Sequence, residues 1–162
     1  MATATNYSFI DTQATIVGVG GSLGLGSGAG NAEEGITIAM TEDKNTMTIG
    51  ADGSVMHSLH ANKAATITVR LLKTSPVNAK LSLMYNVQTA SSTAHGLNVI
   101  SIRNTVSGDA ITATQVAFKK LPDINYAKEG GINEWVFDAG KVEFALGGGI
   151  LANLATFGIG TL

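Results

Sequence analysis

The sequence of 162 residues contains no cysteine, which excludes disulfide bonds and metal sites built on thiolates. It is also poor in charge, because only 14% of its residues are Asp, Glu, Lys or Arg, against about a quarter in an average protein. The net charge of −2 argues against nucleic-acid binding by bulk attraction. We expect a surface with so little charge to be covered in part by copies of the same chain or by partners.

Signals for export or membrane insertion are also lacking in the sequence. The N-terminus has no basic segment followed by an apolar core, so no signal peptide is predicted. The apolar C-terminal segment 147–162 is too short and too rich in glycine to span a bilayer. We therefore expect a chain without a membrane span that is cytoplasmic when made.

The few charges are distributed unevenly along the chain. Residues 1–60 hold six acidic side chains and one basic side chain, a net charge of −5. Residues 61–162 hold nine basic and six acidic side chains, a net charge of +3. Opposite charge in the two halves is compatible with self-association.

Alternation of apolar and polar residues predicts that most of the chain is β-strand. Asp52-Gly53 is a strong hairpin-turn signal between two such stretches, and we expect a second hairpin across Ala139-Gly140. The predicted strands are residues 14–19, 36–40, 46–50, 54–60, 65–72, 97–103, 111–118, 134–138 and 141–146.

One segment, at about residues 76–90, has helical periodicity instead. Ser75-Pro76 is typical of a helix start, with a capping serine and a proline in the first turn. Leu83 and Val87 add a second apolar stripe to the helix, which a free surface would not favour. The apolar residues of the main stripe are Val77, Leu81, Met84 and Tyr85.

Several strands, one helix and several more strands predict a mainly β protein, an antiparallel β-sandwich or barrel with one flanking α-helix. At this length we expect a single domain over residues 1–162. Such a fold has sheet edges that must be protected or used.

A glycine-rich segment, residues 18–35, contains eight of the twenty glycines of the chain. It lies between two predicted strands, and ordering so much glycine costs conformational entropy. We interpret it as a disordered loop that either stays mobile or is ordered by another protein surface, in which case the entropic cost falls on assembly.

Three motifs resemble catalytic, nucleotide-binding or metal-binding sites, but each is better explained as ordinary structure. Ser22 lies in a G-x-S-x-G pattern, but no helix follows as a nucleophile elbow requires, so a small β-sandwich serine hydrolase is only an alternative. The glycines of residues 24–29 match a dinucleotide fingerprint in letters alone, since no βαβ unit surrounds them. His57 and His60 would point to opposite faces of one strand, a poor metal geometry. We predict no catalytic residue, cofactor or metal site.

Four motifs of this chain resemble those of the tail-tube proteins of tailed bacteriophages, especially phages with contractile tails. The likeness covers most of residues 14–146. The motifs are Thr-Ser-Pro-Val-Asn at 74–78, Ser-Gly-Asp at 107–109, Phe-Lys-Lys-Leu-Pro-Asp at 118–123 and Glu-Trp-Val-Phe-Asp-Ala-Gly-Lys-Val at 134–142.

The resemblance implies a β-sandwich with a flanking helix that closes into six-membered rings. Inner strands of neighbouring subunits would join into a barrel around a lumen, and stacked rings would form a tube that conducts genome DNA into the host. Sheath, baseplate and tape-measure proteins would be partners, in a virion tail assembled in the host cytoplasm. Tubes of secretion systems share the architecture, and the main alternative is a tube protein of a secretion system or of a phage-like particle, which would move protein or ions instead of DNA.

The resemblance also implies which residues serve assembly. A long loop near the first hairpin reaches the adjacent ring in the family, and residues 18–35 match its position. A lumen that conducts DNA should be acidic or neutral, because basic side chains would trap phosphates. The candidate lumen acids are Glu33, Glu34, Glu42 and Asp43. The candidate contacts between subunits or rings are Gly18, Gly21, Leu23, Leu25, Gly28, Ile36, Ile38, Val77, Leu83, Val87, Ile150 and Leu151.

Overall fold

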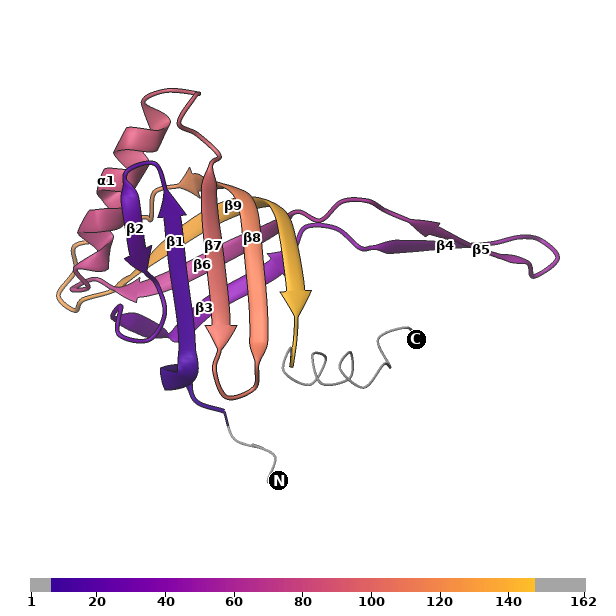
Figure 1. Cartoon of the computed structure of the whole chain (residues 1–162), viewed down its shortest axis with the longest axis horizontal. Coiled ribbons are helices and arrows are strands. Elements are labelled where there is room, and N and C mark those ends of the chain that lie inside the picture. Colours follow the sequence, from indigo (N-terminus) through magenta and orange to yellow (C-terminus); the bar gives the residue numbers. More distant parts are fainter. Residues whose placement is uncertain (1–6, 148–162) are drawn as a thin grey trace.

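The computed structural model describes residues 7–147 of the chain (Figure 1). In this range seven strands form one antiparallel sheet in the order β2-β1-β7-β8-β9-β6-β3, and β4 and β5 form a hairpin outside it. The bounds are η1 Phe9–Asp11, β1 Thr12–Gly18, β2 Gly21–Gly24, β3 Asn31–Met40, β4 Asn45–Ile49, β5 Val55–Leu59, β6 Ala65–Leu72, α1 Val77–Thr89, β7 Asn98–Asn104, β8 Asp109–Lys120 and β9 Ile132–Ala145. The mainly β antiparallel fold with one helix is confirmed.

The sheet curls into a half-barrel around its longest strand, β9 (Figure 1). The first part of β9 pairs with β6, from Ile132 to Ala139, while its later part pairs with β8 as far as Ala145. This one strand therefore belongs to both halves of the sheet, and the two halves enclose the core between them.

The predicted hairpin across Ala139-Gly140 is wrong, because β9 continues without a turn through these residues. On β8, Gln115 lies between Thr114 and Val116, the partners of Lys141 and Ala139, and its backbone φ of 55° is positive. A side chain at position 140 would come within 2.9 Å of the Gln115 side chain, so glycine serves close approach here and not a turn. Two stretches that alternate in the same way were therefore one bent strand.

Helix α1 packs against the concave side of the curled sheet, as its main apolar stripe predicts. Its buried side chains Leu81 and Met84 belong to the same cluster as the inward residues of the strands. The ring of Phe118 joins the layers, with centroids 5.6 Å from Tyr85 of α1 and 5.9 Å from Trp135 of β9. The Trp135 indole also donates to the Asn78 side chain at 2.9 Å, which fixes the start of the helix on the sheet.

The glycine-rich segment is ordered within the subunit, so its interpretation as a disordered loop is corrected. It contains all of β2 and the start of β3. The backbone N–H groups of Leu25 and Ser27 donate to Ala14 and Thr12 of β1, at 2.8 and 3.0 Å. Backbone hydrogen bonds and a buried Leu25 offset the entropic cost during folding of the subunit itself.

A buried polar pair explains one of these glycines. The amides of Gln88 on α1 and Asn98 on β7 exchange two hydrogen bonds of 2.7 Å, and Gln88 also donates to the Val19 carbonyl at 2.8 Å. A Cβ atom at Gly18 would lie 1.7 Å from the Asn98 amide oxygen. Gly18 therefore leaves the space in which helix and sheet are joined.

Candidate assembly surfaces

The β4–β5 hairpin, residues 45–59, projects away from the half-barrel (Figure 1), and we call it the arm. Backbone bonds hold its base, from Thr41 N–H to the Ala64 carbonyl and from His60 N–H to the Lys44 carbonyl, at 3.1 and 2.9 Å. Beyond this base, nearly every residue of the two strands is exposed. An isolated two-stranded hairpin is marginally stable in water, so this arm needs a partner surface.

The two faces of the arm differ in chemistry. Residues paired across the hairpin point to the same face, and the pairs Ile49–Val55 and Met47–His57 share one face with Leu59. The other face carries Thr46, Thr48, Ser58 and a single large apolar residue, Met56. We call the first face the apolar arm face; its exposed fractions are Met47 55%, Ile49 58%, Val55 55% and Leu59 84%.

The tip of the arm is a closed turn. Gly50 N–H donates to the Ser54 carbonyl at 2.7 Å, and Ser54 N–H donates to the Asp52 carboxylate at 3.0 Å. Hydrogen bonding by Ser54, from its side chain and then its backbone, holds the pKa of Asp52 below the ordinary value of 3.8. Gly53 has a φ of 87°, the conformation that the Asp-Gly signal predicts. The predicted hairpin is confirmed.

Strand β3 is a free edge of the sheet. The Thr41 N–H donates to the Ala64 carbonyl at 3.1 Å, next to the Met40–Ala65 pair that ends the ladder with β6, and bonded positions alternate with non-bonded ones in antiparallel strands. The N–H and C=O groups of Ile36, Ile38 and Met40 therefore face the open edge. Their exposure offers a second copy of the chain a strand to pair with.

Two residues predicted to contact a neighbour belong instead to the core of their own subunit. Leu25 is fully buried after β2, and Val77 is 8% exposed in the first turn of α1. Both predictions are corrected, because Leu25 turns inward against β1 and Val77 lies on the face of α1 that packs on the sheet.

The other predicted contact residues stay predictions, because they concern neighbouring copies. Leu83 and Val87 are 66% and 47% exposed on the outer side of α1. Ile150 and Leu151 lie outside the described residues. Of the rest, Gly21 and Gly28 are exposed, while Gly18, Leu23, Ile36 and Ile38 are partly buried.

The predicted acids lie at two places on the surface. Glu33 and Glu34 are exposed in the first half of β3, and Glu42 and Asp43 are exposed between β3 and the arm. Their expected place along a lumen stays a prediction.

The residues set aside as chemical motifs have ordinary structural places. Ser22 lies within β2, paired with Val17 of β1, and is followed by a loop and another strand, so no nucleophile elbow forms. The His57 and His60 rings contact Asn45 and Thr46 at 3.1 and 2.7 Å. Within residues 7–147 no group of three acidic or histidine side chains could hold a metal ion, and no helix is long and apolar enough to cross a membrane.

A family comparison places the chain among known proteins. The family model of the bacteriophage PhiTE tail tube protein matches residues 1–147. The chain belongs to this tail tube family. The resemblance drawn from its motifs is therefore confirmed at the level of the family.

Solved structures similar to this tail tube family member come from contractile injection systems. The tube-terminating cap of the anti-feeding prophage has a TM-score of 0.56 and 15% identity, over 90% of this chain and 95% of that chain. The sheath/tube terminator of an extracellular contractile injection system has a TM-score of 0.53 and 13% identity, over 88% and 99%. The sheath–tube complex of that system has a TM-score of 0.50 and 10% identity, over 83% of this chain and 88% of that chain. At identities this low, the similarity shows a shared fold and nothing more. A search of curated proteins found no match to the chain.

The arm could have been recognised in the sequence as a predicted hairpin whose apolar face has no layer to cover it. Alternation places Met47, Ile49, Val55 and Leu59 on one face of a predicted hairpin. An apolar face on a two-stranded unit has nothing to bury it unless another layer covers it. The glycine content of residues 18–35 was a weaker signal, because glycine also serves close packing.

Proposed function

We propose that this chain is a structural virion protein whose copies form hexameric rings, stacked into the tail tube through which phage DNA passes. Its function is geometric and involves no catalysis. The observation that carries the proposal is the apolar arm face, four large side chains held on a hairpin outside the body of the subunit. In a tube of identical copies, each arm finds the body of a neighbour at a fixed position.

Burial of the arm supplies a driving force for assembly. Each of the four side chains is more than half exposed in the subunit. Burying apolar surface is worth roughly 25 cal/mol per Å², and contact also orders a hairpin that is marginally stable alone. A cooperative tube follows because the same contact repeats in every copy.

The free edge of β3 supports closure within a ring. The backbone groups of Ile36, Ile38 and Met40 can extend the sheet into the next subunit, and a closed ring then leaves no free edge. This gives Ile36 and Ile38, predicted from sequence to contact a neighbour, a role through their backbone atoms.

The charge of the sheet suits a wall along which DNA slides. On strands β6 and β9, Arg70 pairs with Glu134 at 3.3 Å, and Lys63, just before β6, pairs with Glu143 at 3.0 Å. Paired bases attract phosphates less than free ones, and the acids Glu33, Glu34, Glu42 and Asp43 would add repulsion. DNA would pass without specific binding.

Partners follow from the tail that such a tube belongs to. We propose that a sheath surrounds this tube and that baseplate and tape-measure proteins contact it, in a virion tail assembled in the host cytoplasm. Similarity to the sheath–tube complex of an injection system supports the sheath. The same similarity favours one alternative, the tube of a phage-like particle that carries protein instead of DNA.

The arm can be tested with two substitutions matched in chemistry. Met47 and Met56 are 55% and 58% exposed on opposite faces of the same hairpin. We expect Met47→Ser to raise the concentration needed for tube formation about tenfold, because ~1.4 kcal/mol of contact energy is lost. Met56→Ser should change it much less. Negative-stain microscopy and sedimentation over a dilution series would measure both.

Thermal unfolding of both variants by circular dichroism serves as the control, because neither side chain belongs to the core. The proposal fails if Met47→Ser and Met56→Ser assemble equally well, or if the unsubstituted chain forms no hollow rods.

A further inference from the structure

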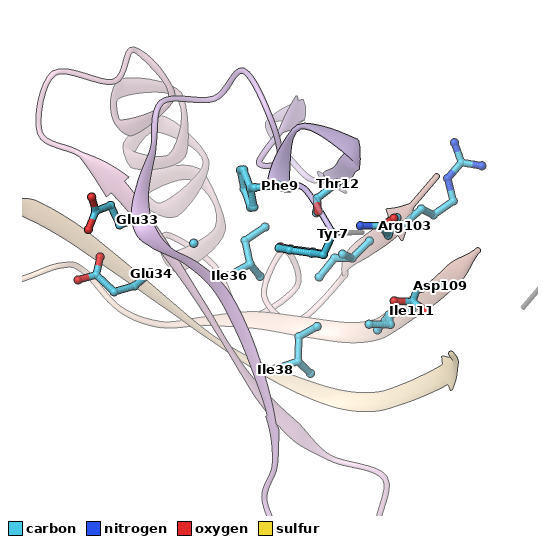
Figure 2. Close-up of a pocket in the computed structure, with 13 residues that line it drawn as sticks. Tyr7, Phe9, Thr12, Glu33, Glu34, Ile36, Ile38, Arg103, Asp109 and Ile111 are labelled. Atoms are coloured by element: carbon cyan, nitrogen blue, oxygen red, sulfur yellow. The ribbon is translucent and has the colours of Figure 1, made fainter. Parts of the chain in front are cut away.

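The half-barrel has an open mouth where its two halves do not meet. A pocket of about 350 Å³ lies there between β3, the start of β1, and the β7–β8 turn (Figure 2). We call it the mouth pocket. Its apolar lining comes from Ile36 and Ile38 of β3, Ile102 of β7 and Ile111 of β8, with Tyr7 and Phe9 at its rim.

The pocket has an apolar patch beside a polar and charged lining, which comes from Thr12, Glu33, Glu34, Arg103, Asn104 and Asp109. Figure 2 shows the Ile36, Ile38 and Ile111 side chains together, while Glu33 and Glu34 point away from them. All three isoleucines pack against the core and stay partly exposed. An apolar site of this volume is large enough to take several side chains of a peptide segment.

The chain itself leaves the sheet at this pocket. Phe144 is the cross-strand partner of Ile111, and three residues later the Gly147 N–H donates to the Asp109 carboxylate at 2.7 Å. Asp109 and Ile111 both line the mouth pocket. Residues 148–162 therefore start at its rim.

The composition of residues 148–162 matches the pocket. These fifteen residues contain no Asp, Glu, Lys or Arg. Residues 1–6 also start near the pocket, but Met1 is their only large apolar side chain. The large apolar side chains of the C-terminal segment are Ile150, Leu151, Leu154, Phe157, Ile159 and Leu162.

We propose that residues 148–162 dock into the mouth pocket of their own subunit through their apolar side chains. Leu151 is four residues from Gly147, and four residues reach at most about 14 Å. A tether this short gives an effective concentration in the millimolar range, which favours the pocket of the same chain over that of another. The family model matches residues 1–147 and leaves residues 148–162 outside the matched range. The proposed docking does not depend on the proposed tube.

The absence of cysteine makes a disulfide test clean. Ile111→Cys lies in the pocket, and Thr112→Cys lies one residue away on the opposite face of β8. Each is combined with Leu151→Cys in the full chain and oxidised at low protein concentration. We expect the Ile111 and Leu151 pair to form a bond within one chain at least tenfold faster than the Thr112 pair, a ratio that ~1.4 kcal/mol of docking would give.

Non-reducing gels separate the outcomes. A bond within one chain keeps the mobility of a monomer, and supports docking in the same subunit. Dimers formed by mixing the Ile111→Cys and Leu151→Cys single variants would overturn the proposal, because the pocket would then take the segment of another copy. Equal rates for the Ile111 and Thr112 pairs would also overturn it.

A second measurement keeps the test valid if a double variant folds poorly. Maleimide labelling of Ile111→Cys is compared in the otherwise intact chain and in a chain that also carries Leu151→Ser and Leu154→Ser. We expect labelling to become about tenfold faster when the segment loses its apolar side chains, while Thr112→Cys is labelled at one rate in both. An unchanged rate at Ile111→Cys contradicts docking.

Discussion

The glycine-rich segment of residues 18–35 and the arm of residues 45–59 follow one another in the chain but relate to the subunit in opposite ways. The first has eight glycines, yet it forms β2, buries Leu25 and donates backbone hydrogen bonds to β1. The second has a regular strand alternation and a closed turn, yet it touches the body only at its base. In this chain the segment with the more flexible composition is therefore the packed one, and the segment with the more regular strand pattern is the exposed one.

The difference shows that burial is decided by partners and not by local order. Leu25 follows a strand that is already paired with β1, so its side chain reaches the core as soon as the sheet forms. Leu59 lies in a hairpin with no second layer within residues 7–147, and it stays 84% exposed. Assembly surfaces are thus found by looking for apolar faces that the fold leaves uncovered.

The largest effect expected from this comparison concerns the two leucines. Leu25→Ala should lower the free energy of unfolding by about 2–5 kcal/mol, because it opens a cavity in the core. Leu59→Ala should change it by no more than about 0.5 kcal/mol, since the side chain is exposed in the subunit. Urea unfolding of dilute protein, followed by circular dichroism, measures both. Similar losses for the two variants would remove the distinction between the segment and the arm.

A smaller effect separates two glycines within the glycine-rich segment. Gly18→Ala should cost about 1–3 kcal/mol, because its Cβ would displace Asn98 and break the two hydrogen bonds between the Asn98 and Gln88 amides. Gly24→Ala should be neutral or stabilising by up to about 1 kcal/mol, since the nearest atom to its Cβ would be 3.8 Å away. The same urea experiment measures both. If Gly24→Ala is as harmful as Gly18→Ala, the segment depends on glycine conformation throughout.

Much of the fold was predictable because alternation and helix-start signals are local. Strand β6 covers Ala65–Leu72 as predicted, and α1 covers Val77–Thr89 within the predicted residues 76–90. The Asp52-Gly53 turn was also predictable, since it follows from the backbone preference of two residues.

The errors arose where a distant residue decides the structure. Gly140 is a strand position because Gln115 of another strand lies against it, and Gly18 is a packing position because Asn98 does. Neither neighbour can be inferred from residues nearby in sequence. The role of the arm was missed for a different reason, since its apolar face follows from local alternation but its place outside the main sheet follows only from the strand order.

The smallest expected effect is an acid response that acts on the arm and spares the glycine-rich segment. The pKa of Asp52 is lowered by Ser54, so the stabilisation is present above the ordinary value of 3.8 and is lost as pH falls through the lower folded value. Residues 18–32 contain no ionisable side chain. Acid should therefore loosen the tip of the arm before it affects Leu25 or Ser27.

Amide hydrogen exchange between pH 6 and about pH 3, corrected for its intrinsic pH dependence, measures this response site by site. Protection of the Ser54 amide should fall at the acid end, while that of Leu25, whose N–H donates to Ala14, should hold. Asp52→Asn keeps an oxygen that can accept the Ser54 N–H but has no charge to lose, so its protection should not depend on pH. A fall at Ser54 that persists in Asp52→Asn would assign the acid response to another group. A simultaneous loss of amide protection at Leu25 would mean that the arm and the glycine-rich segment open as one unit. The two regions would then differ in how they are packed but not in how they respond to acid.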